Sequence, residues 1–417
     1  MIKILIGGSP CTHWSIAQKN NRETEPQGIG WELFKNYLIA KEKFKPDFFL
    51  YENNKSAAQP IKDQISKELG VSLQYINSAL VSAQNRQRFY AHNIPDVPQP
   101  VDRGILLKDI LESGTDLSQN EKSFCMAASY NGACSWNTLE RSQKTMVAES
   151  VCVAQRGRYE STESRSVKVG SDKIIQVYEA REDGKTNTLT TVQKDNMIAE
   201  PVRVGEWDNG SQGNRLYSID GKTPAIRASG AEHIIEPVEF ENGIPLNAIS
   251  LADGKTYPVY EVKDGLITIK GKQYKIKLAD GFYIIRKLTV TECCRLQTMP
   301  DDYCRAVSAS QGYKGLGNGW TAEVIIHILK HMNISLDEEI IVLSMYDGIG
   351  TGRYCFDKMG YKNIKYYAYE IDKYAMQIAM SNYTDIIQCG DAFQVREDNW
   401  SIEKATTEQQ LDCGNKK

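Results

Sequence analysis

Along the first 110 residues of the chain, short apolar runs typical of strands alternate with segments whose apolar residues recur at helical spacing. The run IKILIGG (2–8) is apolar up to its glycines, which predicts a buried parallel strand, and the segments 46–53 and 71–81 are strands of similar character. Between them, 31–44 and 61–70 place apolar residues at helical spacing, and the second of these helices ends in a glycine. Strands that alternate with helices predict an α/β fold with a doubly wound sheet.

The pattern changes between about residue 111 and residue 282, where Thr, Ser, Gly and Asn become frequent and apolar runs are short. Three stretches there, 135–151, 185–202 and 221–238, share a Thr-centred turn, a polar stretch, an apolar pair, a glutamate and a valine. Their irregular spacing excludes a solenoid. We expect duplicated β-hairpin modules in a small β-rich domain inserted into the α/β fold.

Helical and strand patterns return from about residue 283. A Thr-x-x-Glu cap begins an apolar helix at 289–300, and 320–332 is strongly amphipathic. The segment 340–352 is a strand that runs into the glycine-rich turn YDGIGTG, and strands are expected at 365–372 and 386–392. The predicted domains are 1–110, 111–282 and 283–400, followed by a polar tail at 401–417.

Composition narrows the class of protein. With 417 residues, 41% hydrophobic and 25% charged, the chain is long enough for one large or two ordinary globular domains. No apolar run approaches the ~18 residues that cross a bilayer, and no signal peptide is expected. The ten cysteines show no repeated C-x-x-C pair, which argues against a disulfide framework and a zinc site and favours reduced cytosolic thiols. No metal is expected. A net charge of −3 counts mildly against non-specific binding of nucleic acid, which usually requires a basic surface. It is compatible with binding through a local basic cleft.

The glycine-rich turn predicts a nucleotide-like cofactor. A strand, a glycine turn and a helix hold such a ligand at the carboxyl end of a parallel sheet. Glu370 ends the next strand, where a carboxylate binds a ribose diol, and Asp391 ends a third strand, where it accepts from an adenine amine. These features fit NAD as well as S-adenosyl-L-methionine, and a capped turn with two solvated acids is the alternative.

A second group of residues has the chemistry of a nucleophilic site. Cys11 follows a proline directly after the first strand, and a cysteine attacks as its thiolate, which requires backbone N–H groups of a following helix or an arginine. Glu52 ends the neighbouring strand, so its carboxyl is expected beside Cys11, where it hydrogen-bonds a ring nitrogen. Arg86 and Arg88 point to the same side of an extended segment and suit a pyrimidine carbonyl and a phosphate. Each feature alone is more often structural, and their coincidence favours a catalytic site.

Together these segments resemble the cytosine-C5 DNA methyltransferases. SPC fits the family's Pro-Cys nucleophile, ENN its Glu-Asn-Val, and QNRQR its Gln-x-Arg-x-Arg. RKLTVTECCRLQTMPDDY (286–303) fits the segment that braces the recognition domain, and GLGNGW (315–320) fits the Gly-Asn pair that closes the cofactor pocket. SMYDGIGTG, YEIDKYA and GDAFQV fit the cofactor segments. IGGSPC and VSAQNRQR are most similar to the de novo type found in animals.

The order of these segments departs from most of the family, in which the cofactor segments precede Pro-Cys. Here GDAFQV and IKILIGGSPC, normally joined through a short helix, occupy opposite ends of the chain. The resemblance therefore implies a circularly permuted, Rossmann-like S-adenosylmethionine-dependent methyltransferase fold with an inserted β-rich target-recognition domain. Such a permutation is tolerated at a surface connection, and it predicts that residues near 400 lie close to Met1.

The resemblance implies transfer of a methyl group from S-adenosyl-L-methionine to C5 of a cytosine flipped out of duplex DNA. In this mechanism Cys11 adds to C6 and Glu52 engages N3 and the exocyclic amine. Arg88 contacts O2, Arg86 supports a phosphate or the thiolate, and the loop 12–30 closes over the base. The implied cofactor contacts are Pro10, Asn318, Tyr346, Gly348, Gly350, Glu370, Ile371, Asp391 and Ala392. The implied DNA contacts are Ser15, Gln18, Thr188, Leu189 and Arg227, with Thr138-Leu139 as a second candidate for the family's Thr-Leu signature.

The expected partner is double-stranded DNA, which the region 111–282 reads in the major groove. We expect a bacterial or phage-encoded protein that acts as a monomer on cytoplasmic DNA, with a cognate restriction endonuclease as a further partner. Three alternatives stay open. An RNA (tRNA) methyltransferase has the same chemistry but a shorter recognition segment. A catalytically inactive DNA-binding homologue has no need of Cys11, Glu52 and Arg88, and a NAD-linked oxidoreductase leaves them unexplained.

Overall fold

The computed structural model describes residues 1–16, 22–151, 153–162, 166–180, 203–206, 215–217, 249–250 and 256–402. The chain divides into two compact units. The first comprises Met1–Ile110, Glu121–Ala133 and Leu288–Lys417, and the second comprises Leu111–Asn120 and Cys134–Lys287. The stretch 121–133 therefore packs in the first unit, although it falls within the predicted β-rich region.

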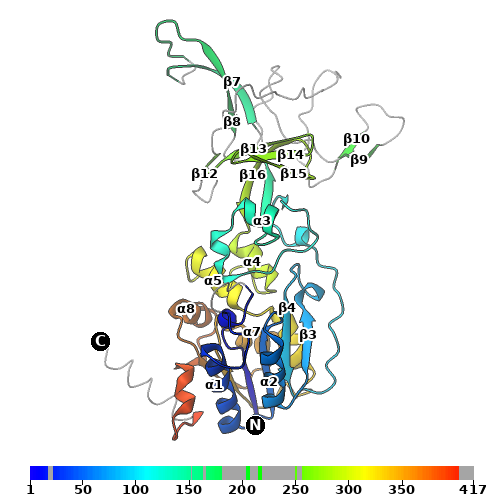
Figure 1. Ribbon diagram of the computed structural model, residues 1–417, viewed down its shortest axis with the longest axis vertical. Coiled ribbons are helices and arrows are strands. Elements are labelled where there is room, and N and C mark those ends of the chain that lie inside the picture. The colour runs from blue at the N-terminus through cyan, green and yellow to red at the C-terminus, as the bar shows by residue number, and fades with distance from the viewer. Residues whose placement is uncertain are drawn as a thin grey trace. The chain divides into compact units, whose positions relative to one another are not determined.

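A seven-stranded sheet forms the centre of the first unit (Figure 1). The strand order is β19 (Ile386–Gly390), β18 (Ile364–Tyr369), β17 (Ile340–Met345), β1 (Ile2–Gly7), β2 (Phe48–Asn54), β4 (Gln87–His92) and β3 (Leu73–Asn77). The five strands from β19 to β2 are parallel, and β4 is antiparallel to both of its neighbours. β17 is buried throughout, as an apolar strand in the middle of a parallel sheet should be. The doubly wound α/β fold is confirmed, while the reversed strand β4 was not predicted.

Helices cover both faces of this sheet. On one face, α1 (Ile29–Phe44) and α2 (Gln59–Leu69) share a hydrophobic cluster with Leu5 and Tyr51, in which the rings of Tyr37 and Tyr51 lie 5.0 Å apart. On the other face lies α7 (Thr351–Met359), so close that a Cβ on Gly352 would collide with Ile6. Because successive residues of β1 point to opposite faces, Leu5 packs in the core on the side of α1 and α2, and Ile6 packs on the side of α7.

The remaining helices of the first unit are α4 (Val290–Leu296), α5 (Ala309–Asn318), α6 (Ala322–Lys330) and α8 (Lys373–Asn382). The predicted cap of the first of these is confirmed. Thr289 Oγ1 accepts the Glu292 N–H at 3.1 Å, and Glu292 Oε2 accepts the Thr289 N–H at 2.8 Å. This reciprocal pair satisfies two N–H groups that the helix itself leaves without partners.

The second unit is built on an antiparallel sheet (Figure 1). Its order is β15 (Lys272–Lys275), β14 (Leu266–Ile269), β13 (Val259–Lys263), β16 (Gly281–Lys287), β6 (Met146–Ser150) and β5 (Thr115–Asp116). Two-stranded pairs are formed by β7 (Val153–Tyr159) with β8 (Ile174–Ala180), β9 (Arg203–Glu206) with β10 (Arg215–Tyr217), and β11 (Ile249–Ser250) with β12 (Thr256–Tyr257).

The predicted hairpin at 135–151 is wrong, because this stretch forms helix α3 (Ser135–Arg141) followed by strand β6. The Asn137 side chain accepts the Cys134 N–H at 3.2 Å, so a local cap favours the helix. The other two expected modules, 185–202 and 221–238, lie outside the described residues.

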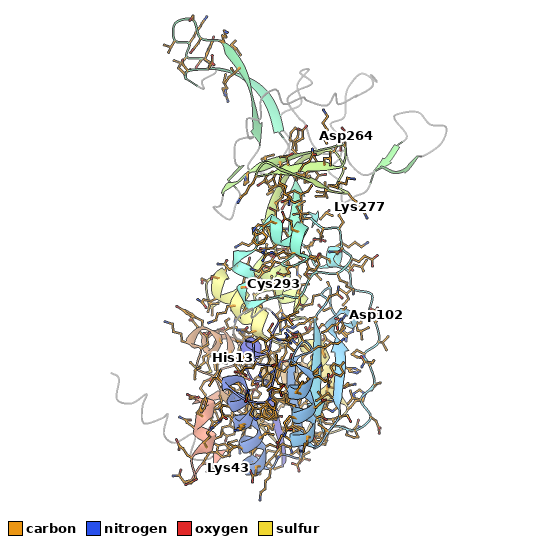
Figure 2. The ribbon with its side chains drawn as sticks, viewed as in Figure 1. His13, Lys43, Asp102, Asp264, Lys277 and Cys293 are labelled. Carbon is orange, nitrogen blue, oxygen red and sulfur yellow. The ribbon has the colours of Figure 1, made fainter. Side chains whose placement is uncertain are left out.

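The first strand and the segment 395–397 both contact the last turn of α1. Lys43, labelled in Figure 2, donates from Nζ to the carbonyls of Val395 and Glu397 at 2.9 and 2.6 Å. The neighbouring carbonyl of Phe44 accepts from Lys3 Nζ at 3.3 Å. Circular permutation of the chain stays a prediction, and this proximity of 395–397 to the first strand is the geometry that it requires.

Candidate active site

The loop that carries Cys11 is fixed by the strand beside it. A Cβ on Gly8 would lie 2.7 Å from the Glu52 carbonyl oxygen, so only glycine allows β1 to leave the sheet at this point. Asn53 Nδ2 donates to the Ser9 carbonyl at 2.9 Å, and Ser9 Oγ shares a 2.7 Å hydrogen bond with the Tyr51 hydroxyl. The residues around Glu52 in β2 thus hold the Ser-Pro-Cys turn in place.

Glu52 and Arg88 form a nearly buried ion pair at the same edge of the sheet. Glu52 Oε1 lies 2.9 Å from Arg88 Nε, and the side chains are 12% and 11% exposed. Arg88 reaches Glu52 because β4 pairs directly with β2. The prediction that Cys11, Glu52 and Arg88 gather at one place is consistent with this geometry, since the charges of Arg88 and Glu52 both act on the thiol.

The electrostatic surroundings of Cys11 disfavour its thiolate in this arrangement. Burial raises the pKa of its thiol, the positive charge of Arg88 lowers it, and the negative charge of Glu52 raises it. Residues 11–13 form a short 3-10 turn rather than the start of an α-helix, and the backbone N–H of Cys11 itself lowers the pKa of the thiol less than burial, Arg88, Glu52 and Arg86 alter it. Arg88 is therefore the main group that stabilises a Cys11 thiolate.

Backbone carbonyls surround the Arg86 side chain, which bears on the two roles expected for it, contact with a phosphate or support of the thiolate. Arg86 is 3% exposed, and its guanidinium donates to the carbonyls of Met126 at 2.9 Å and Gly319 at 2.8 Å. A phosphate contact would require it to leave these carbonyls. Its charge still lowers the pKa of Cys11, after the effects of burial, Arg88 and Glu52. The arrangement favours support of the thiolate over contact with DNA.

Two further side chains lie in this cluster that the sequence did not single out. Trp320 Nε1 donates to Glu52 Oε2 at 3.0 Å, so both carboxylate oxygens have partners. Cys125 Sγ lies 3.5 Å from Arg86 Nη1 and 4.0 Å from Arg88 Nη2. The sequence offered an indication for Trp320, because this residue ends the segment GLGNGW (315–320). No local pattern marks Cys125.

The glycine-rich turn between β17 and α7 is bound to the next strand end. Gly348 has φ of +64° and its N–H donates to Glu370 Oε2 at 2.8 Å, while Gly350 has φ of +78° and caps α7. The Tyr303 hydroxyl donates to the Ile349 carbonyl at 3.0 Å. The predicted turn and carboxylate thus occur together, and Tyr303 is a support that the sequence did not reveal.

The other residues expected at the cofactor lie at the ends of the strands or of α5. Glu370 Oε1 accepts the N–H groups of Ile371 and Asp372, both at 2.8 Å, and the Ile371 side chain is 72% exposed. Asp391 Oδ1 accepts the N–H of Phe393 at 2.9 Å. Ala392 is buried, Asn318 is the exposed last residue of α5, and Pro10 is exposed beside Cys11.

Tyr346 and Asp347, at the start of the glycine-rich turn, are held by hydrogen bonds to residues around them. The Tyr346 hydroxyl donates to the Leu33 carbonyl at 2.7 Å and accepts from Asn36 Nδ2 at 3.1 Å. Burial raises the pKa of Asp347 to about 6, although its Oδ1 accepts hydrogen bonds from Ser344 and Tyr366. Its second oxygen, Oδ2, is buried with no hydrogen-bond partner within the described part of the chain.

The residues expected to contact DNA are only partly described. Gln18, Thr188, Leu189 and Arg227 lie outside the described residues. The Ser15 N–H donates to the Cys11 carbonyl at 3.0 Å. In α3, Thr138 is buried and its hydroxyl donates to the Lys144 carbonyl at 2.8 Å, so its side chain joins the helix to the turn that follows it.

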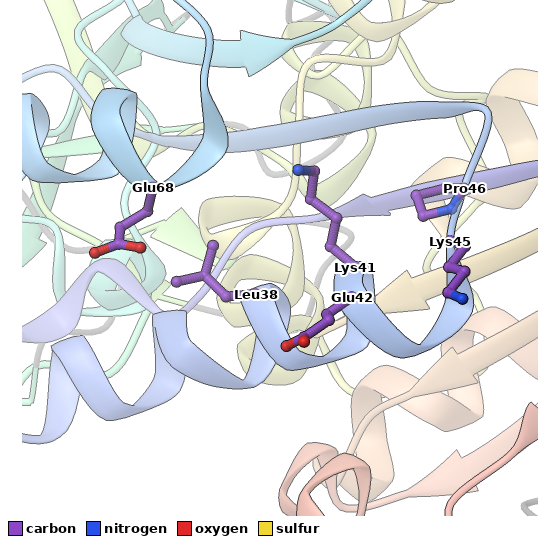
Figure 3. A pocket seen from close by; sticks show the side chains of 6 residues that line it. All are labelled: Leu38, Lys41, Glu42, Lys45, Pro46 and Glu68. Atoms are coloured by element: carbon purple, nitrogen blue, oxygen red, sulfur yellow. The ribbon is translucent and has the colours of Figure 1, made fainter.

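Other features of the described residues lie apart from this cluster. A pocket of about 470 Å³ is lined by Leu38, Lys41, Glu42, Lys45, Pro46 and Glu68 (Figure 3). It lies where α1 ends and the chain enters β2, at the opposite end of the sheet from Cys11. Within the described ranges, no three His, Cys, Asp or Glu side chains gather as metal ligands, and no helix is long and apolar enough to span a bilayer.

The fold and this cluster define a doubly wound α/β protein with a cysteine, a glutamate and an arginine at one strand edge and a glycine turn suited to a nucleoside cofactor nearby. The chain belongs to the C-5 cytosine-specific DNA methylase family, whose model matches residues 1–333. It is accordingly a DNA cytosine-C5 methyltransferase.

Individual methyltransferases of phages and of a bacterium also match the chain. The orphan methyltransferase M.SPRI of Bacillus phage SPR is 24% identical over 392 residues, covering 79% of this chain and 82% of that protein. The orphan methyltransferase M.Rho11sI of Bacillus phage rho11s is 24% identical with coverage of 79% and 84%. The type II methyltransferase M.HgiBI of Herpetosiphon aurantiacus is 35% identical over 98 residues, which is 21% of this chain and 22% of that protein.

Proposed function

We propose that the protein transfers a methyl group from S-adenosyl-L-methionine to C5 of a cytosine flipped out of duplex DNA, with Cys11 as the nucleophile. The observation that carries this proposal is the Glu52–Arg88 pair, at 2.9 Å, whose two charges act on the Cys11 thiol. Extrusion of the base costs a few kcal/mol, and it is required because C6 is out of reach within the stacked duplex.

Each side chain has one task in this mechanism. Cys11 loses its proton and Sγ adds to C6, which makes C5 nucleophilic, while Arg88 stabilises the developing thiolate and binds O2 of the base. Glu52 binds N3 and the exocyclic amine, and Trp320 keeps its carboxyl oriented. After methylation, solvent water accepts the C5 proton and the electron pair of that C–H bond restores the C5–C6 double bond. Sγ leaves C6 as a thiolate, which takes a proton from solvent to restore the thiol.

The residues around the glycine turn fit S-adenosyl-L-methionine. Glu370 lies at the turn, where its carboxylate suits a ribose diol, and the exposed side chains of Ile371 and Phe393 offer apolar cover for an adenine. Oδ2 of Asp347, which is buried and has no partner among the described residues, is a further acceptor beside the turn. When bound, S-adenosyl-L-methionine supplies the electrophilic methyl group.

Circular permutation is part of the proposal. The family match ends at residue 333, before the cofactor strand β17 begins at Ile340. The sheet nevertheless pairs β17 with β1 in register, from Ile2 beside Ile340 to Gly7 beside Met345. This supports cofactor segments that follow the catalytic segments in sequence while lying beside them in space.

The second unit is proposed to recognise the target sequence, and the protein is proposed to act on DNA as a monomer. The relatives that match along most of their length are named orphan methyltransferases, while the type II relative matches over 98 residues. We therefore favour action without a paired endonuclease, with a restriction partner as the alternative.

Methyl transfer is tested with isotopically labelled S-adenosyl-L-methionine, mixed-sequence duplex DNA and a matched RNA, followed by mapping of 5-methylcytosine. Label in cytosine C5 of the duplex is expected, and label in RNA alone would overturn the proposed substrate. On a duplex with 5-fluorocytosine at the mapped site, the wild type should form a covalent adduct and Cys11→Ser should not. Cys134→Ser, a half-buried cysteine of the second unit, is the matched control and should form the adduct. An adduct in Cys11→Ser would remove Cys11 from its role.

A further inference from the structure

Cys125 places a second sulfur against the arginines of the active site. It lies on the stretch 121–133, which packs against the segment before β4: the Ser123 N–H donates to the Ala83 carbonyl at 2.7 Å, and the Met126 N–H donates to Gln84 Oε1 at 3.2 Å. These contacts fix the backbone on both sides of Cys125. Its Sγ thereby lies 3.5 Å from Arg86 Nη1 and 4.0 Å from Arg88 Nη2, within hydrogen-bonding reach of both.

The two thiols respond to the same arginines with opposite results. Burial opposes ionisation of Cys125, but Arg86 and Arg88 outweigh it and the pKa of this thiol is lowered. For Cys11 burial dominates and the pKa is raised, with Arg88 and Arg86 only partly compensating. A negative charge on Cys125 therefore neutralises part of the positive charge that would stabilise a thiolate at Cys11.

We propose that Cys125 is a positioning residue that sets the reactivity of Cys11 through the two arginines that both thiols share. The inference rests on the proposed function, in which Cys11 is the nucleophile. Cys125 Sγ accepts a hydrogen bond from each guanidinium group and donates to the Met126 carbonyl at 3.6 Å. On ionisation of Cys125 the two bonds from the arginines become charge-assisted, and they then draw on the charge that would stabilise a Cys11 thiolate. When Arg88 turns toward the base, its charge is shared less with Cys125.

Other charged and titratable groups also act on this cluster. Glu52 of β2 raises the pKa of Cys11 and pairs with Arg88, and Tyr90 of β4 acts on Arg88. Substitutions at Cys125 leave these groups in place. A change in the titration of Cys11 can then be assigned to the charge at position 125.

The test is the pH dependence of Cys11 alkylation by iodoacetamide in the full chain, followed residue by residue with mass spectrometry in the absence of DNA. Cys125→Ser removes the ionisable group and Cys125→Asp makes the negative charge permanent. We expect Ser to lower the midpoint for Cys11 and Asp to raise it. A shift of half a unit to one unit corresponds to a rate change of about three- to tenfold at a fixed pH below the midpoint.

The matched control is Cys134→Ser, which alters a half-buried cysteine of the second unit while keeping a side chain able to cap α3. It should leave the Cys11 midpoint unchanged. Because the two Cys125 variants are expected to shift the midpoint in opposite directions, a general loosening of the site cannot produce the result. Equal midpoints in wild type, Ser and Asp variants, or shifts of the same sign, would overturn the inference.

Methyl transfer by the same preparations separates the two hypotheses. If Cys11 titrates as expected in the variants but no preparation methylates duplex DNA, the proposed function fails while the electrostatic coupling stands. If the wild type methylates DNA and the Cys11 midpoint does not move, the coupling fails while the function stands.

Discussion

Gln297 joins three segments of the active-site framework that are far apart in sequence. It is fully buried, its Nε2 donates to the Leu316 carbonyl at 2.5 Å, and its Oε1 accepts from Gln84 Nε2 and Thr321 Oγ1, both at 2.9 Å. Gln84 also donates to the Leu296 carbonyl at 2.6 Å. The side chain of Gln297 thus connects the segment before β4, helix α5 and the start of α6. Replacing it by methionine keeps its length and removes these three bonds, together with a longer fourth one from Nε2 to the Gly319 carbonyl at 3.4 Å.

The size of the effect follows from these contacts. Each buried polar group that loses its partner costs about 1–3 kcal/mol, and the Leu316 carbonyl and the Thr321 hydroxyl bear most of this cost. Gln84 keeps one acceptor and contributes less. Burial of the methionine side chain stabilises the folded state by about 1.5–3 kcal/mol, which offsets part of this cost. We therefore expect Gln297→Met to lower the free energy of unfolding of the first unit by about 1–3 kcal/mol.

Urea unfolding followed by tryptophan fluorescence and far-UV circular dichroism measures this change. The matched control is Gln64→Met in α2, where the amide donates only to Glu68 on the helix surface. The control should change stability by less than about 0.5 kcal/mol. If Gln297→Met is no more destabilising than the control, the buried amide does not hold the three segments together and the reasoning is refuted.

Three further predictions concern the site itself. Gly8→Ala places a Cβ 2.7 Å from the Glu52 carbonyl oxygen and should slow methyl transfer by about 100-fold in single-turnover assays; wild-type rates would contradict this. Asn36→Leu removes the donor to Tyr346 and should weaken binding of S-adenosyl-L-homocysteine about tenfold in calorimetry, whereas unchanged affinity would show that the bond is dispensable. Burial raises the pKa of Asp347 from 3.8 to about 6, so the folded state gains from protonation below the unfolded value and loses this gain as the pH rises through 6. Asp347→Asn should therefore add about 1–3 kcal/mol of stability at pH 8 and little at pH 4, and an equal gain at both pH values would refute the assignment.

The sequence by itself determined the local elements and the residue types of the site. The continuous apolar run of β1, the Thr289 cap and the glycine turn before α7 each depend on residues within a few positions of one another, and the structure contains all three. The rule that parallel strands present their carboxyl ends at one edge predicts Cys11 near Glu52, and in the structure the charge of Glu52 acts on the Cys11 thiol. Sequence alone failed at 135–151, where a local cap made a helix of an expected hairpin.

Only the tertiary structure decided how the charges of the site are distributed. Arg86 and Arg88 are two residues apart, yet one is bound by carbonyls of Met126 and Gly319 and the other pairs with Glu52. No periodicity encodes this difference, because it depends on which distant segment packs against each guanidinium. The same holds for Cys125, which reaches the arginines only because 121–133 folds back onto the first unit. Hydrophobic patterning specifies faces and turns, whereas the ionisation of a buried thiol depends on contacts between residues that are far apart in the chain.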